Sequence, residues 1–158
     1  MNKEKRIWIA LFLVLTLMLI LSGCSGLPKT AKINITIDPN PVPYSSEDDY
    51  WPFDIILDES NGVGVTLNSV RWDEYGQEEQ LIYTNIWYET DEEEITLRFG
   101  SNYLPAFSSL QNQDEFGNFG YYIVAGDEFA KYIVLTIEGV DDNENLIEAT
   151  GRVDILPK

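Results

Sequence analysis

The sequence predicts an all-β fold in which two antiparallel sheets pack face to face. Apolar and polar residues alternate over much of the chain, and clusters of Gly, Pro, Asn and Asp separate the alternating runs. Outside the first 23 residues, no stretch of ten has helical periodicity. A period of two is what a strand with one buried and one solvated face requires. Short strands separated by turns at regular spacing are typical of a two-sheet sandwich, and a small barrel is the alternative.

About seven strands are expected. The run 81–88 differs from the others because it is apolar on both faces, which predicts a central strand or one whose outer face meets a loop or a partner. The remaining runs present one apolar face each. The predicted strands are 33–37, 53–57, 65–72, 81–88, 95–99, 133–137 and 147–155.

One of these strands changes phase along its length. Val65 and Leu67 stand in one alternation, and Val70 and Trp72 stand in the other. A β-bulge adds one residue to a strand and thereby shifts the alternation by one position. We therefore expect a bulge near residues 68–69 that keeps both apolar pairs in the core.

The chain begins with the layout of an export signal. Basic residues precede an apolar run, 7–21, and the small pair Ser22-Gly23 leads to Cys24, the single cysteine. Fifteen apolar residues are short for a bilayer span, which needs about 20. An ordinary cleaved signal and an uncleaved anchor remain alternatives, as does a buried free thiol at Cys24.

The stretch LSGC, which ends at Cys24, resembles a bacterial lipobox. The resemblance implies that Cys24 becomes the first residue of the mature protein and carries a diacylglycerol on its sulfur, often with an acylated amine. Two or three acyl chains hold a protein stably on a membrane, whereas one holds it only marginally. The expected organisation is a signal peptide at 1–23, a lipidated tether at 24–32 and one β-sandwich domain at 33–158.

The charge of the chain limits its partners. The formal net charge is −17, and it becomes −19 once residues 1–23 are removed. Such a surface repels phosphates, so we expect no nucleic acid partner. The membrane contact is expected through the acyl chains of Cys24, on a surface outside the cytoplasm, either the cell surface or the periplasmic face.

Three patches resemble immunoglobulin-like or fibronectin type III-like modules of bacterial exported proteins. They are IDPNPV from Ile37, ESNGVGV from Glu59 and GVDDNENLIEATGRVDI from Gly139. The resemblance implies an immunoglobulin-like sandwich and makes the last patch its closing hairpin. That hairpin has Asn143-Glu144 in place of Asn-Gly, which predicts a loop longer than two residues. The antibody-type cysteine pair is absent, while Trp72 is a candidate core tryptophan.

The absence of histidine removes Ser-His-Asp and Cys-His mechanisms. A carboxylate pair acting on a glycosidic bond is the enzymatic alternative, although most carboxylates fall at outward-facing or loop positions. No cofactor is expected, apart from a weak calcium candidate. Hard cations favour clustered carboxylate and amide oxygens, and Asp141, Asn143 and Asn145 offer them at alternate positions.

Aromatic residues supply the candidate partner-binding residues. Phe116, Phe119 and Tyr121 lie among glycines and charges in DEFGNFGYY, a composition typical of a recognition loop, and Trp87 lies in the strand that is apolar on both faces. We therefore expect a non-catalytic, lipid-anchored envelope protein that binds a protein or polysaccharide partner or serves as an accessory subunit. The alternative is a carbohydrate-active enzyme that uses two carboxylates.

The lipobox generates the first prediction. Cys24→Ser removes the sulfur that would carry the diacylglycerol, so the variant should fail to incorporate a radiolabelled fatty acid that the unmodified chain incorporates. Electrophoresis of cells grown with the labelled fatty acid measures this directly. Label retained by the variant would count against lipidation at this position.

Overall fold

The computed structural model describes residues 29–47, 49–90, 93–112, 120–121 and 129–158. Within these ranges the chain forms ten strands and one short helix. In chain order they are β1 (Ile33–Asp38), β2 (Trp51–Pro52), β3 (Asp54–Glu59), β4 (Val65–Tyr75), β5 (Leu81–Tyr88), α2 (Glu94–Phe99), β6 (Tyr103–Leu104), β7 (Ser109–Gln111), β8 (Gly120–Tyr121), β9 (Tyr132–Asp141) and β10 (Leu146–Asp154).

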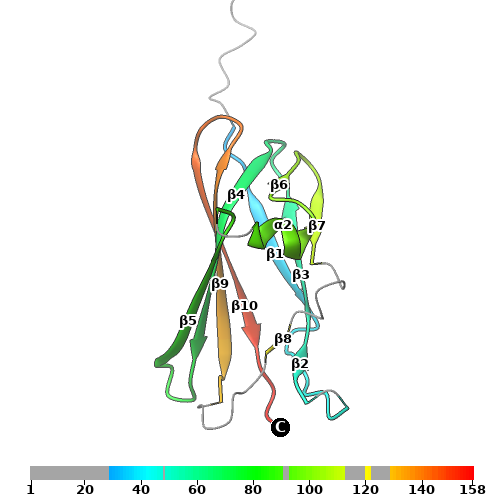
Figure 1. Ribbon diagram of the computed structural model, residues 1–158, viewed down its shortest axis with the longest axis vertical. Helices are drawn as coiled ribbons and strands as arrows, with labels where there is room; N and C mark the ends of the chain where they lie inside the picture. Colours follow the sequence, from blue (N-terminus) through cyan, green and yellow to red (C-terminus); the bar gives the residue numbers. More distant parts are fainter. Residues whose placement is uncertain (1–28, 48, 91–92, 113–119, 122–128) are drawn as a thin grey trace, which may run out of the picture.

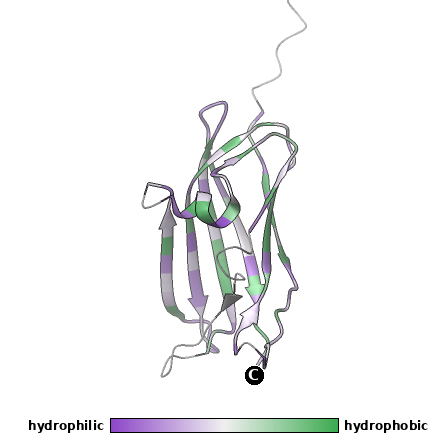
Figure 2. Cartoon of the chain, turned by 45° about the vertical axis from the view of Figure 1, so that its right-hand side comes forward, coloured by the Kyte–Doolittle hydropathy of each residue, from purple (hydrophilic) through white to green (hydrophobic). Residues whose placement is uncertain are grey.

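The strands form two antiparallel sheets that face one another (Figure 1). One sheet has the order β1-β3-β7, and the other has the order β10-β9-β4-β5, with β6 added to the end of β4. β2 and β8 form a small separate pair. The prediction of an all-β chain with antiparallel sheets is confirmed. Along the strands, hydrophobic and hydrophilic residues alternate (Figure 2).

The core lies between the sheets and uses the alternating residues that the sequence indicated. Ile55 and Leu57 of β3 and Ile133, Leu135 and Ile137 of β9 belong to one hydrophobic cluster, and all five are essentially inaccessible to solvent. Burial of each such side chain stabilises the fold by about 1.5–3 kcal/mol before the loss of chain entropy is counted. The largest fully buried side chains are those of Trp51, Ile55, Leu57, Leu67, Ile95, Leu104, Ile133, Leu135, Ile137, Val42, Val65 and Val70.

The predicted bulge in β4 is confirmed. The register between β4 and β9 shifts between Leu67 and Ser69, so that Leu67 pairs with Gly139 while Val70 pairs with Ile137. The backbone passes so close at this point that a Cβ on Gly139 would stand 2.5 Å from the carbonyl oxygen of Thr66. Glycine at position 139 therefore permits the bulge, and the bulge keeps both halves of β4 in the core.

The predicted strand 95–99 is wrong, because these residues form α2. Ile95 and Phe99 are buried, as expected, but they are four residues apart and lie on one face of a helix. Leu97 between them is 39% exposed. The ion pair between Glu94 and Arg98, again four residues apart, supports the helix, and Gly100 ends it with φ 73°.

Two other expectations concern the ends of the large sheet. Among the described residues β5 is an edge strand, which rules out the first of the two alternatives, a central strand, and leaves the second, an outer face that meets a loop or a partner. The hairpin between β9 and β10 has the longer loop that the sequence indicated: the amide of Asp141 donates to the carbonyl of Asn145, and Glu144 has φ 64°.

The predicted tether is partly folded against the domain. Ala31 is buried, and its amide donates to the carboxylate of Asp141, while the carbonyl of Lys29 accepts from the side chain of Asn143. The described part of the expected tether, from residue 29, therefore contacts the turn between β9 and β10. In the described part of the chain, no helix is long and apolar enough to cross a membrane.

Glu59 organises the loops at the end of the domain where the described chain begins. Its carboxylate is buried at the end of β3 and lies 2.7–3.3 Å from five backbone nitrogens. Burial alone would raise the pKa of Glu59, but the N–H donors overcome it and hold the pKa at about 2, below the ordinary 4.5. The donors are the amides of Lys32, Asn61, Gly62, Val63 and Phe107.

We predict that Glu59→Gln lowers the free energy of unfolding at neutral pH by roughly 2–4 kcal/mol, because an amide accepts at only one of its two ends and leaves buried donors unpaired. A lowered folded-state pKa means that the stabilisation is complete above pH 4.5 and is lost as the pH falls towards 2. The difference in unfolding free energy between the two proteins should shrink over that interval, as measured by urea denaturation at several pH values.

The control variant is Glu148→Gln on the exposed face of β10, which removes the same charge without removing a buried acceptor. Its effect should stay within about 0.5 kcal/mol at each pH. A difference between wild type and Glu59→Gln that does not change with pH would contradict this account of the buried carboxylate.

Candidate functional site

β5 presents a different set of residues on each side of the large sheet. Its register with β4 pairs Trp87 with Val70 and Asn85 with Trp72, and both β4 partners are buried. Trp87 and Asn85 therefore point to the side of the opposite sheet. Residues 84, 86 and 88 point to the outer side, because successive side chains of a strand alternate.

Many large side chains of β5 are accessible to solvent. Leu81 and Tyr83 are 55% and 52% exposed, and Tyr88 and Ile86 are 43% and 37% exposed. Ile86 and Tyr88 are exposed on the outer side of the sheet and Tyr83 on the other side, so both faces of β5 present accessible apolar side chains, whereas single exposed apolar residues are ordinary on protein surfaces. This strand is therefore the candidate contact surface of the domain.

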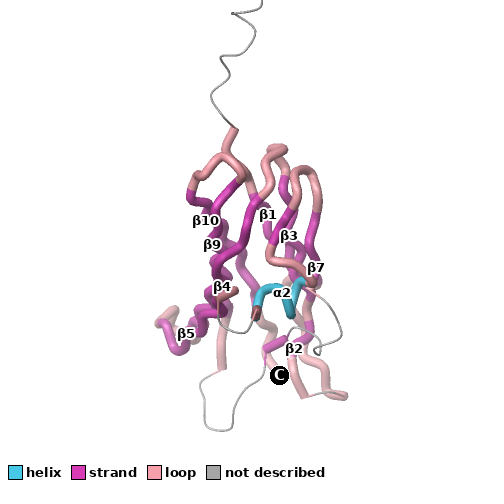
Figure 3. The backbone as a smooth tube through the Cα atoms, turned by 45° about the horizontal axis from the view of Figure 1, so that its top comes forward, coloured by secondary structure: helices cyan, strands magenta, loops and turns pink. Residues whose placement is uncertain are grey.

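α2 is held beside the carboxyl-terminal half of β5 (Figure 3). Glu89, which directly follows β5, accepts hydrogen bonds from both the backbone N–H and the hydroxyl of Thr96. These bonds satisfy an amide of the first helical turn, which has no intrahelical partner. Because Glu93 makes no side-chain cap, the carboxylate of Glu89 fixes the start of the helix relative to the strand.

The position of α2 brings Arg98 over Trp87. The guanidinium carbon lies 4.2 Å from the ring centroid, and Glu94 holds the same guanidinium from the other side at 3.0 Å. The same indole also packs against Trp72 in a tilted arrangement, with ring centroids 5.9 Å apart. A cation over an indole contributes about 0.5–1 kcal/mol at an exposed site. Trp87 is thus fixed between the core and a charged side chain.

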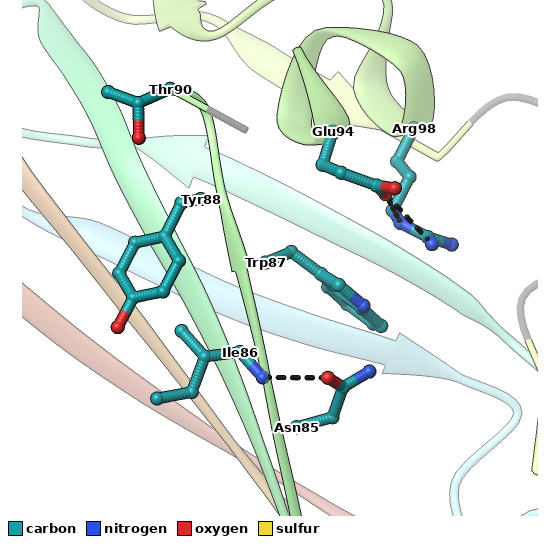
Figure 4. Close-up of a pocket in the computed structure, with 7 residues that line it drawn as sticks. All are labelled: Asn85, Ile86, Trp87, Tyr88, Thr90, Glu94 and Arg98. Atoms are coloured by element: carbon teal, nitrogen blue, oxygen red, sulfur yellow. Dashed lines mark hydrogen bonds and ion pairs between the residues drawn. The ribbon is translucent and has the colours of Figure 1, made fainter. Parts of the chain in front are cut away.

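An open pocket of about 770 Å³ lies between β5 and α2 (Figure 4). In Figure 4 the indole of Trp87 and the pair formed by Glu94 and Arg98 point to one side, while Ile86 and Tyr88 point to the other. The pocket combines an aromatic face, a guanidinium and amide groups, which suit polar planar groups such as peptide amides or sugar rings. It is lined by Asn85, Ile86, Trp87, Tyr88, Thr90, Glu94 and Arg98.

Of the four predicted partner-binding residues, Trp87 is the one that lies in this pocket. Phe116 and Phe119 lie outside the described residues. Tyr121 is described in its backbone alone, in β8, where it pairs with Trp51 of β2. Trp51 itself is buried, and its indole N–H donates to the carbonyl of Leu156.

The calcium candidates lie together at the turn between β9 and β10. One carboxylate oxygen of Asp141 accepts from the amides of Asn143 and Asn145, and the other accepts from the amide of Ala31. Burial opposes ionisation of Asp141, but these donors, with the side chain of Asn145, lower its pKa to about 2. Among the described residues, no three carboxylates or thiols are grouped to hold a metal ion.

Arg98, Glu94 and Asn85 line the pocket but were not predicted as site residues. The signal for the first two was their spacing of four residues, which places opposite charges on one helical face. This spacing was overlooked because the alternation of Ile95, Leu97 and Phe99 favoured a strand. Asn85 carried no signal, because a polar residue in a strand is ordinary.

No protein family model and no curated protein matches this chain. Two solved structures are similar in backbone. One is a Northeast Structural Genomics Consortium target, SoR45, with 10% identity over 82% of this chain and 90% of that chain and a TM-score of 0.46. The other is a Bordetella pertussis protein described as ApaA, with 11% identity over 82% of this chain and 98% of that chain and a TM-score of 0.45.

We predict that Arg98→Ala exposes the face of Trp87 and lowers the free energy of unfolding by about 0.5–1.5 kcal/mol, because both a cation–π contact and a partly exposed ion pair are lost. Quenching of tryptophan emission by acrylamide should increase. Arg98→Lys is the matched control. It keeps the charge without the planar group and should give a smaller increase.

The same substitution in a Trp87→Phe background should leave quenching unchanged, since the reporting indole is gone. If Arg98→Ala does not alter quenching in the presence of Trp87, the guanidinium does not cover the ring in solution.

Proposed function

We propose that this protein is a lipid-anchored, non-catalytic binding module of the cell envelope. The observation that carries the proposal is the exposed apolar strand β5 with the pocket that it forms with α2. Apolar patches of this kind, rimmed by polar residues, mark interaction sites on soluble domains. Residues Trp87, Tyr88 and Arg98 are the types most enriched where binding energy is concentrated at interfaces.

The module belongs, in this proposal, to the immunoglobulin-like sandwiches. In that fold strands A, B and E share one sheet, strands C, F and G share the other, and the variable type adds strand C′ beside C. Assigning A, B, C, C′, E, F and G in chain order to β1, β3, β4, β5, β7, β9 and β10 reproduces this division. The buried Trp72 on β4 takes the place of the tryptophan on strand C.

The carboxylates favour binding over glycosidic chemistry. A general acid needs a raised pKa. Glu59 and Asp141 are buried, but their pKa values are lowered to about 2 because backbone N–H groups donate to them. Both oxygens of each carboxylate are engaged in holding loops together, which supports a structural role for these two acids.

The proposed anchor sets how the module would stand on a membrane. Five residue steps separate Cys24 from Lys29, and a fully extended chain spans at most about 3.6 Å per step, or about 18 Å. The turn at 141–145, which contacts Lys29 and Ala31, would then lie near the bilayer. β5 lies beside the part of β4 that is further from this turn (Figure 1), where it would be accessible to other envelope components.

Photo-crosslinking in intact cells tests the binding function. A photoreactive phenylalanine analogue at Tyr88 should give a covalent adduct of higher mass than the protein alone, because that side chain lies at the proposed contact surface. The same analogue at Thr36, which is exposed on β1 of the other sheet, is the control and should give none. Adducts of equal yield at both positions, or none at either, would contradict the proposal.

A further inference from the structure

The two edge strands of the large sheet, β10 and β5, differ in whether other described residues cover their outer edge. The outer edge of β10 is covered by residues 40–42. The amide of Val42 donates to the carbonyl of Asp154, and the side chain of Asn40 both accepts from the amide of Asp154 and donates to the carbonyl of Arg152. At the other edge, β5 pairs with β4, and no further strand follows it among the described residues.

The direction of the free backbone groups of β5 follows from its register. The amide of Glu89 donates to the carbonyl of Asn68, so these two residues form a hydrogen-bonded pair of the antiparallel ladder. Hydrogen-bonded and non-hydrogen-bonded pairs alternate, so the next pair, Tyr88 and Ser69, is non-hydrogen-bonded. The N–H and C=O groups of Tyr88 therefore point away from β4. The same holds for Ile86 and Thr84, two and four residues earlier. We call the outward N–H and C=O groups of these three residues the β5 edge.

A side-chain contact agrees with this direction. The amide of Ile86 donates to the side-chain oxygen of its own neighbour, Asn85, at 3.0 Å (Figure 4). An exposed amide that bonds to an adjacent side chain has no strand beside it. This local bond can be exchanged for a ladder bond, because a side-chain amide and a backbone carbonyl are equivalent acceptors.

The β5 edge lacks the usual protection against pairing. Natural edge strands carry Lys, Pro or inward charges that prevent another strand from adding. Residues 81–88 have no charge and no proline, in a chain that is 23% charged. Acidic residues flank this run on both sides: two at 78–79 before it and five of the six residues at 89–94 after it.

We propose that the β5 edge binds an extended segment of a protein partner by strand addition, and that this segment has an uncharged, β-branched or aromatic centre with Lys or Arg at both ends. Main-chain hydrogen bonds to residues 84, 86 and 88 supply the pairing. The pocket beside Trp87 and Arg98 takes one side chain of the added strand, because alternate residues of that strand face α2. Basic ends match the acidic flanks.

A second copy of this chain is a poorer occupant of the same edge. The charges among residues 78–79 and 89–94, which flank β5 in the sequence, are all negative. Two copies paired through this edge would bring like-charged flanks near one another, which disfavours such a pair. Glu79 is already paired with Lys131, which partly compensates its charge.

This inference rests on the proposed binding function, and its test uses the full lipidated chain in discs of zwitterionic lipid. The probe is a fluorescent peptide, KKTVTVYVTKK, and its binding is followed by anisotropy. We expect saturable binding that is at least tenfold weaker for the same centre flanked by Glu. Discs without protein control for binding of the peptide to lipid.

Backbone pairing is tested by methylating the peptide. Two versions carry N-methyl groups on alternate central residues, in one phase or the other. In strand addition only one phase faces the β5 edge, so one version should lose binding at least tenfold and the other should bind nearly as well as the parent. Equal affinities of the two versions, or of the Lys- and Glu-flanked peptides, would overturn the inference.

Substitutions at Ile86 provide an independent test of strand addition. Ile86→Pro removes an outward N–H and no bond to β4, so it should weaken peptide binding at least tenfold, while Ile86→Val should change binding less than twofold. If Ile86→Pro unfolds, the methylated peptides still decide the question on the unmodified chain. Self-association that Ile86→Pro abolishes, without peptide binding, would show that a second copy occupies the edge and would overturn the inference.

The crosslinking experiment separates this inference from the proposed function. An adduct at Tyr88 that persists in Ile86→Pro means that a partner binds through side chains, so strand addition is wrong while the binding function stands. Loss of the adduct in Ile86→Pro but not in Ile86→Val supports strand addition. Absence of the adduct from all three proteins removes the binding function itself.

Discussion

The pairing of β4 with its neighbours is the constraint on which the rest of the structure depends. β4 is the longest strand, and it bonds to β9 along one edge and to β5 and β6 along the other. Its bulge at residues 67–69 lets Val65 and Leu67 face the same core as Val70 and Trp72. Without that extra residue, one half of the strand would turn its apolar residues to solvent.

Two buried carboxylates hold loops together in a chain that has few basic side chains. The chain has 27 Asp and Glu against 10 Lys and Arg, so most acidic side chains cannot find a basic partner. Glu59 and Asp141 instead accept backbone N–H groups both from the turns that follow them and from segments distant in sequence, and both hold the segment that leads into β1. Charge-assisted bonds of this kind are stronger than neutral ones. These bonds connect the amino-terminal segment to the loops at this end of the domain.

Most strands could be predicted from the sequence, because a strand with one buried face alternates apolar and polar residues. The sequence also indicated the bulge, since a phase change in an apolar pattern has few other physical causes. It failed for Ile95 and Phe99, which are four residues apart and fit one face of either a helix or a strand. The spacing of Glu94 and Arg98 would have distinguished the two. The edge position of β5 could not be predicted, because apolar residues on both faces look the same whether a neighbouring strand or an external partner covers them.

The acidic flanks of β5 resolve a conflict that an unprotected edge creates. An uncharged edge strand invites pairing with any exposed strand, including the same strand of another copy, and this is a common route to aggregation. Anchoring many copies on one membrane would increase that hazard, because it raises their local concentration. Negative charge at both ends of the strand repels a second copy and attracts a segment with basic ends. The same charges would therefore disfavour pairing with a second copy and favour a partner with basic ends. The backbone groups of Thr84, Ile86 and Tyr88 would form the hydrogen bonds to that partner.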